Sequence, residues 1–132
     1  MLSSNYSNKV DWSKVFRIWC DIFTPQIGML HYFTKNELGH GDEYRSFQVG
    51  SFRSALSPEV PNAGWMMFYG DDFSEKINFG HLEDAGFYVK NESGGYVVRI
   101  TDEIQDVAND FPSFSRRREE MKKLFPEKFF LE

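Results

Sequence analysis

The side chains of this sequence that could do chemistry are one cysteine and three histidines. Cys20 and His31 both lie in apolar stretches, where a buried cysteine or a hydrogen-bonded histidine is more common than a nucleophile or a metal ligand. His40 and His81 lie near acids, but neither has a partner at the spacing of a metal-binding pair. We therefore expect no metal and no cofactor, and whether any of these four residues has a functional role stays open.

Motifs for phosphate binding and acyl transfer are also missing. The stretch NESGG (91–95) lacks the lysine and the helix of a phosphate-binding loop, and Ser51 in VGSFR lacks the second glycine of a nucleophile elbow. The adjacent Asp71 and Asp72 are better explained as residues at a helix start than as paired catalytic carboxylates. A dyad of Cys20 with a histidine stays open, because catalytic partners need not be neighbours in sequence. We predict that the protein is not an enzyme.

The acids of this chain are concentrated in its middle. The net charge is −5, and residues 71–110 hold three Lys or Arg against ten Asp or Glu. This disfavours nucleic acid as a partner and suits a basic protein, because complementary charge speeds encounter and selects the partner. The alternative is an acidic face that only keeps the protein soluble. The candidate partner-binding residues are the acids around a predicted helix and a predicted hairpin: Asp71, Asp72, Glu75, Glu83, Asp84, Glu92, Asp102, Glu103 and Asp106.

Length and composition indicate one domain, residues 1–132, with residues 1–9 flexible. The chain has 14 Phe, 6 Tyr and 3 Trp, enough aromatic surface to stabilise a core of this size. One cysteine excludes an internal disulfide framework. The first residues have no basic segment followed by an apolar run, and no stretch is apolar enough to span a membrane. We therefore expect a cytoplasmic protein that binds no membrane.

The first half of the chain predicts one helix and two strands. Residues 11–23 have helical periodicity, with Asp11 or Ser7 as the cap and an inner face formed by Trp12, Val15, Phe16, Trp19, Ile22 and Phe23. Residues 28–34 form a short strand or an inner turn. Residues 35–46 and 57–62 are predicted loops, and 47–56 are not assigned. The run Trp65–Tyr69 in PNAGWMMFYGDDF is a predicted buried strand, and we predict that Trp65, Phe68, Trp19 and Phe16 are core residues.

The second half predicts short helices and a hairpin. A helix capped by Ser74 or Asp72 runs to Gly86 with Phe73, Ile77, Leu82 and Ala85 on its inner side, although Gly80 makes two short helices an equal alternative. Alternation around NESGG predicts a β-hairpin over residues 87–101. A short acidic helix follows, then a C-terminal helix starting at Pro112, with Phe114, Met121, Leu124 and Phe125 inside. The fold class is α+β: an antiparallel sheet of about three to five strands, with the N-terminal and C-terminal helices packed on it.

The order of these segments resembles small bacterial immunity proteins, which are encoded beside toxins of polymorphic-toxin and type VI secretion systems. The resemblance spans residues 10–130 and is clearest in two stretches, PNxGW…G and FSxRRxxxKxLF: Pro61, Asn62, Gly64, Trp65 and Gly70, and Phe114, Ser115, Arg117, Arg118, Lys122, Leu124 and Phe125. It implies a protein without catalytic residues that binds a cognate toxin, for example a nuclease, and covers its active site. The alternatives are a phage- or plasmid-encoded regulatory protein and a small enzyme.

Overall fold

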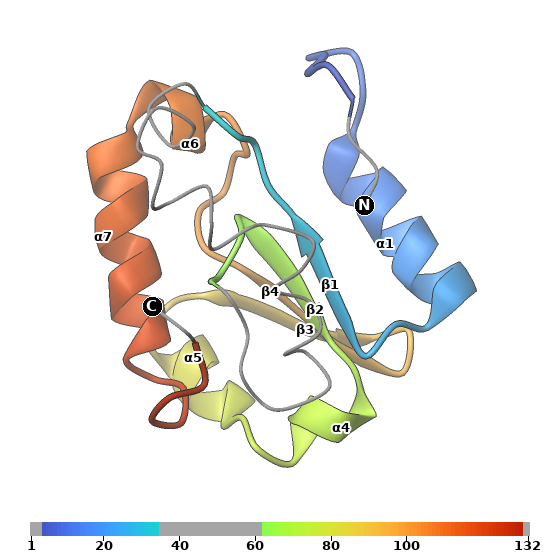
Figure 1. Cartoon of the computed structure of the whole chain (residues 1–132), viewed down its shortest axis with the longest axis vertical. Helices are drawn as coiled ribbons and strands as arrows, with labels where there is room; N and C mark the ends of the chain where they lie inside the picture. The colour runs from blue at the N-terminus through green and yellow to red at the C-terminus, as the bar shows by residue number, and fades with distance from the viewer. Residues whose placement is uncertain (1–3, 35–61, 131–132) are drawn as a thin grey trace.

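The computed structural model describes residues 4–34 and 62–130, which form an antiparallel sheet with helices on its two sides (Figure 1). Four strands make up the sheet in the order β1-β2-β4-β3: β1 (Ile27–Leu30), β2 (Met66–Tyr69), β4 (Gly95–Arg99) and β3 (Tyr88–Glu92). The predicted α+β class, with an antiparallel sheet and an N-terminal and a C-terminal helix, is confirmed. The predicted segments at 35–46, 47–56 and 57–61 lie outside the described residues.

Strand β2 is the centre of the core. All four of its residues are buried, because β1 and β4 flank it in the sheet and side chains cover both of its faces. Phe68 lies opposite Gly28 on one side and Val97 on the other. Trp65, just before the strand, is buried and donates a hydrogen bond from Nε1 to Thr101 Oγ1 at 3.1 Å. The prediction that this aromatic run is a buried strand is confirmed.

Helix α1 (Trp12–Phe23) covers one face of the sheet. Asp11 caps it, as predicted, by accepting a hydrogen bond from the backbone N–H of Lys14. Phe16 and Cys20 are the buried residues of the helix, and Phe16 lies over Gly28, where a methyl group would come within 3.2 Å of its ring. The absence of a side chain at Gly28 therefore lets the helix approach the sheet.

The predicted inner face of this helix is partly wrong. Trp19, Ile22 and Phe23 were expected inside, but their exposed fractions are 41%, 66% and 71%. Eight of the twelve residues of α1 are apolar, so they surround more of the helix than one sheet can cover. The side that carries Phe16 and Cys20 packs against the strands, and the other apolar side faces outward.

The opposite face of the sheet carries an aromatic cluster. The Tyr69 ring lies 5.6–6.3 Å, centroid to centroid, from four phenylalanine rings that come from different segments: Phe73, Phe79, Phe125 and Phe129. The rings come from three segments: α4 (Asp71–Ser74), α5 (Phe79–Asp84) and the chain after α7 (Phe111–Lys122), which supplies both Phe125 and Phe129. Figure 1 shows α1 and α7 on the two sides of the sheet. The strands therefore separate two apolar layers.

The segment between β2 and the hairpin forms two short helices, which was one of the two predicted alternatives. Gly70 and Asn78 precede them as N-caps, so the prediction of Ser74 or Asp72 as the cap is wrong. Phe73, Ile77 and Leu82 are buried as predicted, whereas Ala85 is exposed. Gly86, with φ of +83°, ends the second helix, as predicted.

The predicted hairpin is confirmed as β3 and β4. Ser93 and Gly94 form its two-residue turn with φ of +56° and +76°, the left-handed values of a type I′ turn. Val89, Tyr96 and Val98 share one face, as the alternation of the sequence predicts.

The C-terminal part agrees with the sequence in outline. Helix α6 (Asp106–Asn109) is the predicted short acidic helix, and Asp110 caps the longer helix α7 by accepting a hydrogen bond from the backbone N–H of Ser113. Phe114, Met121 and Phe125 are buried, and Leu124 is half-buried. At the other end of the chain, the Tyr6 ring packs on Tyr32 at 4.9 Å, and the flexibility expected of residues 1–9 stays a prediction.

Candidate functional site

The nine predicted partner-binding acids lie at different ends of the sheet. Asp71 directly follows β2 at its Tyr69 end, whereas Asp102 follows β4 at its Arg99 end. Arg99 pairs with Met66, at the start of β2, so these two ends are opposite. The structure therefore does not bring the nine acids together on one surface, and each group has its own surroundings.

Glu92 belongs to a structural ion pair. It accepts hydrogen bonds from the Arg17 guanidinium on both carboxylate oxygens, at 2.7 Å from Nη2 to Oε2, and Lys90 Nζ lies 3.4 Å away. These bonds, those from Arg17 first, hold the pKa of Glu92 below its ordinary 4.5. The pair ties α1 to the hairpin, and that gives Glu92 a structural role of its own.

Asp102 and Asp106, which follow β4, form contacts within the segment that leads to α7. Asp102 pairs with Arg99 at 3.2 Å, and Asp106 accepts a hydrogen bond at 3.2 Å from the backbone N–H of Glu103. The Asp102 side chain is almost fully exposed, so its ion pair contributes little to stability. Asp102 and Asp106 thus have local partners inside the chain, whereas the exposed carboxylate of Glu103 forms no ion pair within the described residues.

Five acids remain, and we call them the acidic end of the molecule: Asp71, Asp72, Glu75, Glu83 and Asp84. All five are exposed. Within residues 4–34 and 62–130, none of them forms an ion pair with a lysine or an arginine. The one lysine in this stretch, Lys76, lies 5.9 Å from the centre of the Phe73 ring instead. The acidic end therefore presents carboxylates that the described part of the chain does not neutralise.

The helix dipole favours two acids of the acidic end and disfavours two others. Asp71 and Asp72 occupy the first turn of α4, where the positive end of the helix dipole stabilises a carboxylate. Glu83 and Asp84 are the last residues of α5, at the negative end of its dipole, and they are adjacent like charges. The helix dipole thus explains the positions of Asp71 and Asp72, but it does not explain those of Glu83 and Asp84. Glu83 and Asp84 are the strongest candidates for contact with a basic partner.

The cysteine and histidines occupy separate places. Burial, and then the negative charge of Glu92, raise the pKa of the Cys20 thiol to about 11. His31 accepts a hydrogen bond at Nδ1 from the Trp65 backbone N–H at 3.1 Å, and its ring packs on Phe33 and Phe114. His81 is exposed on α5, and His40 lies outside the described residues. The interpretation of Cys20 as a buried hydrophobic residue and of His31 as a hydrogen-bonded one is confirmed.

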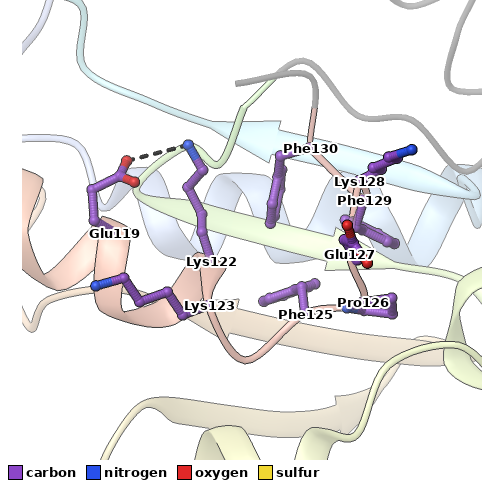
Figure 2. Close-up of a pocket in the computed structure, with 9 residues that line it drawn as sticks. All are labelled: Glu119, Lys122, Lys123, Phe125, Pro126, Glu127, Lys128, Phe129 and Phe130. Atoms are coloured by element: carbon purple, nitrogen blue, oxygen red, sulfur yellow. Dashed lines mark hydrogen bonds and ion pairs between the residues drawn. The ribbon is translucent and has the colours of Figure 1, made fainter.

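A shallow groove lies beside the C-terminal end of α7 (Figure 2). Its volume is about 390 Å³, and aromatic and charged residues line it: Glu119, Lys122, Lys123, Phe125, Pro126, Glu127, Lys128, Phe129 and Phe130. Lys122 Nζ lies 3.2 Å from Glu119 and 5.7 Å from the centre of the Phe130 ring. Its ammonium group is therefore engaged within the chain, and neither a cysteine nor a histidine lines the groove.

A second groove, of about 550 Å³, runs between α1 and the hairpin turn and is lined mostly by polar residues: Asp11, Ser13, Lys14, Arg17, Ile18, Asp21, Glu92 and Ser93. The Arg17–Glu92 ion pair lies in this groove. Elsewhere in the described part of the chain, no cluster of three or more His, Cys, Asp or Glu side chains is arranged to hold a metal ion. No helix in that part has both the length and the apolar character that crossing a membrane requires.

The exposed apolar side of α1 is the surface feature that the sequence interpretation missed. Five residues with spacings of three and four define it, and we call it the outer α1 face: Val15, Ile18, Trp19, Ile22 and Phe23. All of them except Val15, which is half-buried, are exposed. A signal was present in the sequence, because apolar residues occupy two sides of this helix and Ile18 lies outside the stripe that contains Phe16.

Comparison of the chain with protein-family models, with curated proteins and with solved structures found no match. A function for this chain therefore has to be argued from its own residues and their arrangement.

Proposed function

We propose that the protein is an immunity protein that binds a cognate antibacterial toxin, for example a nuclease, and covers its active site. The observation that carries the proposal is the pair Glu83 and Asp84 at the end of α5, exposed and without a cationic partner among the described residues. The three further acids of the acidic end belong to α4 and to the residue after it. A toxin that acts on nucleic acid needs a basic surface to hold phosphates. Carboxylates placed on that surface occupy the position of the substrate phosphates.

The segment that carries the acidic end is anchored by buried apolar side chains. Four apolar residues are interspersed with its acids along residues 71–84, and all are buried in the core: Phe73, Ile77, Phe79 and Leu82. The backbone that carries the carboxylates is therefore held in place before a partner arrives. Preorganisation lowers the entropy that binding costs, so a small surface can bind tightly.

The first experiment tests the class of protein. The chain is expressed together with the product of the neighbouring gene, and growth and complex formation are both measured. We expect the neighbour to be toxic alone, and we expect this protein to relieve the toxicity and to co-purify with it. A neighbour that is not toxic, or toxicity that this protein does not relieve, contradicts the proposal. A stable complex without relief of toxicity favours a regulatory binding protein instead.

The second experiment tests the surface. Reversing Glu83 and Asp84 to lysine should slow association with the toxin and abolish protection, because surface charge mainly sets the association rate. The same reversal at Glu119 and Glu120 is the matched control: these are also adjacent exposed acids, but they pair with Lys122 and Arg117 on α7. Protection by the control should be unchanged. The Glu83 and Asp84 variant should keep the thermal stability of the wild type, whereas the control should be somewhat less stable because it breaks two ion pairs on α7.

The dependence of the association rate on salt concentration is an independent test of the acidic end. Charges on a surface are screened over about 8–10 Å near physiological ionic strength, so added salt should slow the association of the wild type. The Glu83 and Asp84 variant should be less sensitive to salt. If both associate at the same salt-independent rate and still protect, the toxin binds elsewhere on the molecule and the acidic end only keeps the protein soluble.

A further inference from the structure

We propose that the outer α1 face binds a second copy of this chain, with the two α1 helices antiparallel about a two-fold axis. This goes beyond the proposed function, because it concerns a different surface and a different partner. The face consists of apolar side chains at positions i, i+3, i+4, i+7 and i+8, which is the spacing of a helix that packs against another helix.

The outer α1 face is unusual for an isolated domain. Ile18, Trp19, Ile22 and Phe23 are exposed on the same side of one helix, and they make a continuous stripe rather than scattered single residues. Contiguous apolar patches on the surface of a protein mark interaction sites. The other side of α1 is already occupied, because Phe16 and Cys20 pack on the sheet. Figure 1 shows α1 at the periphery of the molecule, so a second helix can lie against it without a change in the fold.

The charges beside this face are complementary to those of a second copy. Lys14 lies in the first turn of α1 and Asp21 in the last, seven residues apart, so both are on the same side of the helix. This order opposes the helix dipole, which favours acids at the start and bases at the end. An isolated α1 therefore gains nothing from the arrangement. In an antiparallel pair, Lys14 of each copy lies next to Asp21 of the other, so the same attraction occurs twice.

The two charged residues are free for this contact within the described part of the chain. Lys14 forms no ion pair there, and the Asp21 side chain only accepts a hydrogen bond from the Ser93 hydroxyl at 3.3 Å. With the axis beside Ile18 and Trp19, Val15 of one helix lies opposite Ile22 of the other, and Asp21 lies about 3 Å along the axis from the position opposite Lys14, within reach of both side chains. A two-fold interface must be self-complementary, and both the apolar stripe and the charges meet that condition.

The size of the face sets the expected strength. Three turns of helix from each copy form a contact at the low end of specific interfaces, below about 1,200 Å² in total. We therefore expect a dimer that dissociates on dilution. Sedimentation velocity over about a hundredfold range of concentration should show the wild type moving from monomer to dimer, as mass action requires.

The first variant tests the apolar stripe. Ile22→Lys places a charge against Val15 of the other copy, and because Ile22 is exposed the substitution should leave the melting temperature of the diluted protein unchanged. The variant should remain a monomer at concentrations where the wild type is a dimer. Asp84→Lys, a charge change on α5, is the control and should dimerise as the wild type does. A wild type that stays monomeric at all concentrations overturns the proposal, as does a dimer that Ile22→Lys leaves intact.

A charge exchange tests the antiparallel arrangement. Lys14→Asp alone places two acids together, and Asp21→Lys alone places two bases together, so each should raise the dimer dissociation constant by about threefold to tenfold. The double variant restores both pairs and should dimerise like the wild type. Because the exchange also agrees with the helix dipole, it should not destabilise α1. Failure of the double variant to recover overturns the arrangement. The toxin assay is a separate measurement, so this proposal and the proposed function can fail independently.

Discussion

Tyr69 buries a hydroxyl group that has no hydrogen-bond partner among the described residues, in the middle of four phenylalanine rings. An unpaired buried hydroxyl costs the free energy of removing it from water. We therefore predict that Tyr69→Phe raises the free energy of unfolding by about 1 kcal/mol, measured by urea denaturation. A destabilised Tyr69→Phe variant would show that the hydroxyl is paired.

Trp65 shows the contrasting case, a buried side chain whose polar atom is paired. Its indole N–H donates to Thr101, and its ring is almost completely buried. Trp65→Ala removes both the packing and the bond and should lower the free energy of unfolding by about 3–5 kcal/mol. The same urea titration measures it, and Trp19→Ala, at an exposed aromatic position, is the matched control with a loss well below that range.

Glu92 makes stability depend on pH. Its pKa is lowered in the folded state by Arg17, so its contribution is present above its ordinary pKa of 4.5 and is lost as the pH falls through the lowered value. Glu92→Gln should therefore cost about 1 kcal/mol near neutral pH, and the difference from the wild type should shrink below pH 4.5. Denaturation at several pH values measures this.

At the scale of elements, two neighbouring glycines hold the hairpin in different ways. A methyl group at Gly95 would clash with the Tyr69 carbonyl oxygen, whereas one at Gly94 would meet nothing within 4 Å. Gly94 instead needs its positive φ of 76°. Gly95→Ala should cost about 3 kcal/mol or more because it forces β4 away from β2. Gly94→Ala should cost only about 1–2 kcal/mol, the penalty of a left-handed backbone. Equal losses in urea denaturation would contradict this distinction.

The same scale shows which elements the sequence could predict. The hairpin and β2 have strong local signals, since alternation around NESGG and a short apolar run before Gly70 each fit one structure. Helix α1 was predicted, but its predicted inner face was right for Phe16 and wrong for Trp19, Ile22 and Phe23. Its apolar residues occupy two sides, and only the position of the sheet, with Gly28 under Phe16, decides which side is buried. The spacing of apolar residues along the helix does not show which of its sides is buried.

For the whole molecule, the sheet separates two apolar layers, one beneath α1 and one around Tyr69. Phe16 lies in the first layer, and Phe125, 5.6 Å from Tyr69 between ring centres, lies in the second. Phe16→Leu and Phe125→Leu should each cost about 1–2 kcal/mol, and the double variant should lose the sum within about 0.5 kcal/mol. Urea denaturation of the three variants tests this. A large deviation from additivity would show that the two layers are coupled through the strands.

The candidate site could be predicted from the sequence only as a set of acids. Residues 71–110 carry most of the negative charge, but charge density along a chain does not show where the chain turns. The antiparallel register places Asp71 and Asp102 at opposite ends of the sheet, and the partner of Glu92 is Arg17, which lies 75 residues earlier. A long-range ion pair accounts for Glu92, and local contacts account for Asp102 and Asp106. Glu103 and the five acids of the acidic end have no cationic partner among the described residues.

The rate at which Cys20 is labelled can report how often α1 separates from the sheet. Cys20 is the only thiol in the chain, it lies on the side of α1 that is buried against the sheet, and its pKa is raised to about 11. Disulfide reagents react with thiolates, so the native thiol is protected both by burial and by protonation. The rate at which such a reagent labels the protein therefore reports how often α1 leaves the sheet, without an added probe. If α1 pairs with a second copy, labelling should become slower as the protein is concentrated.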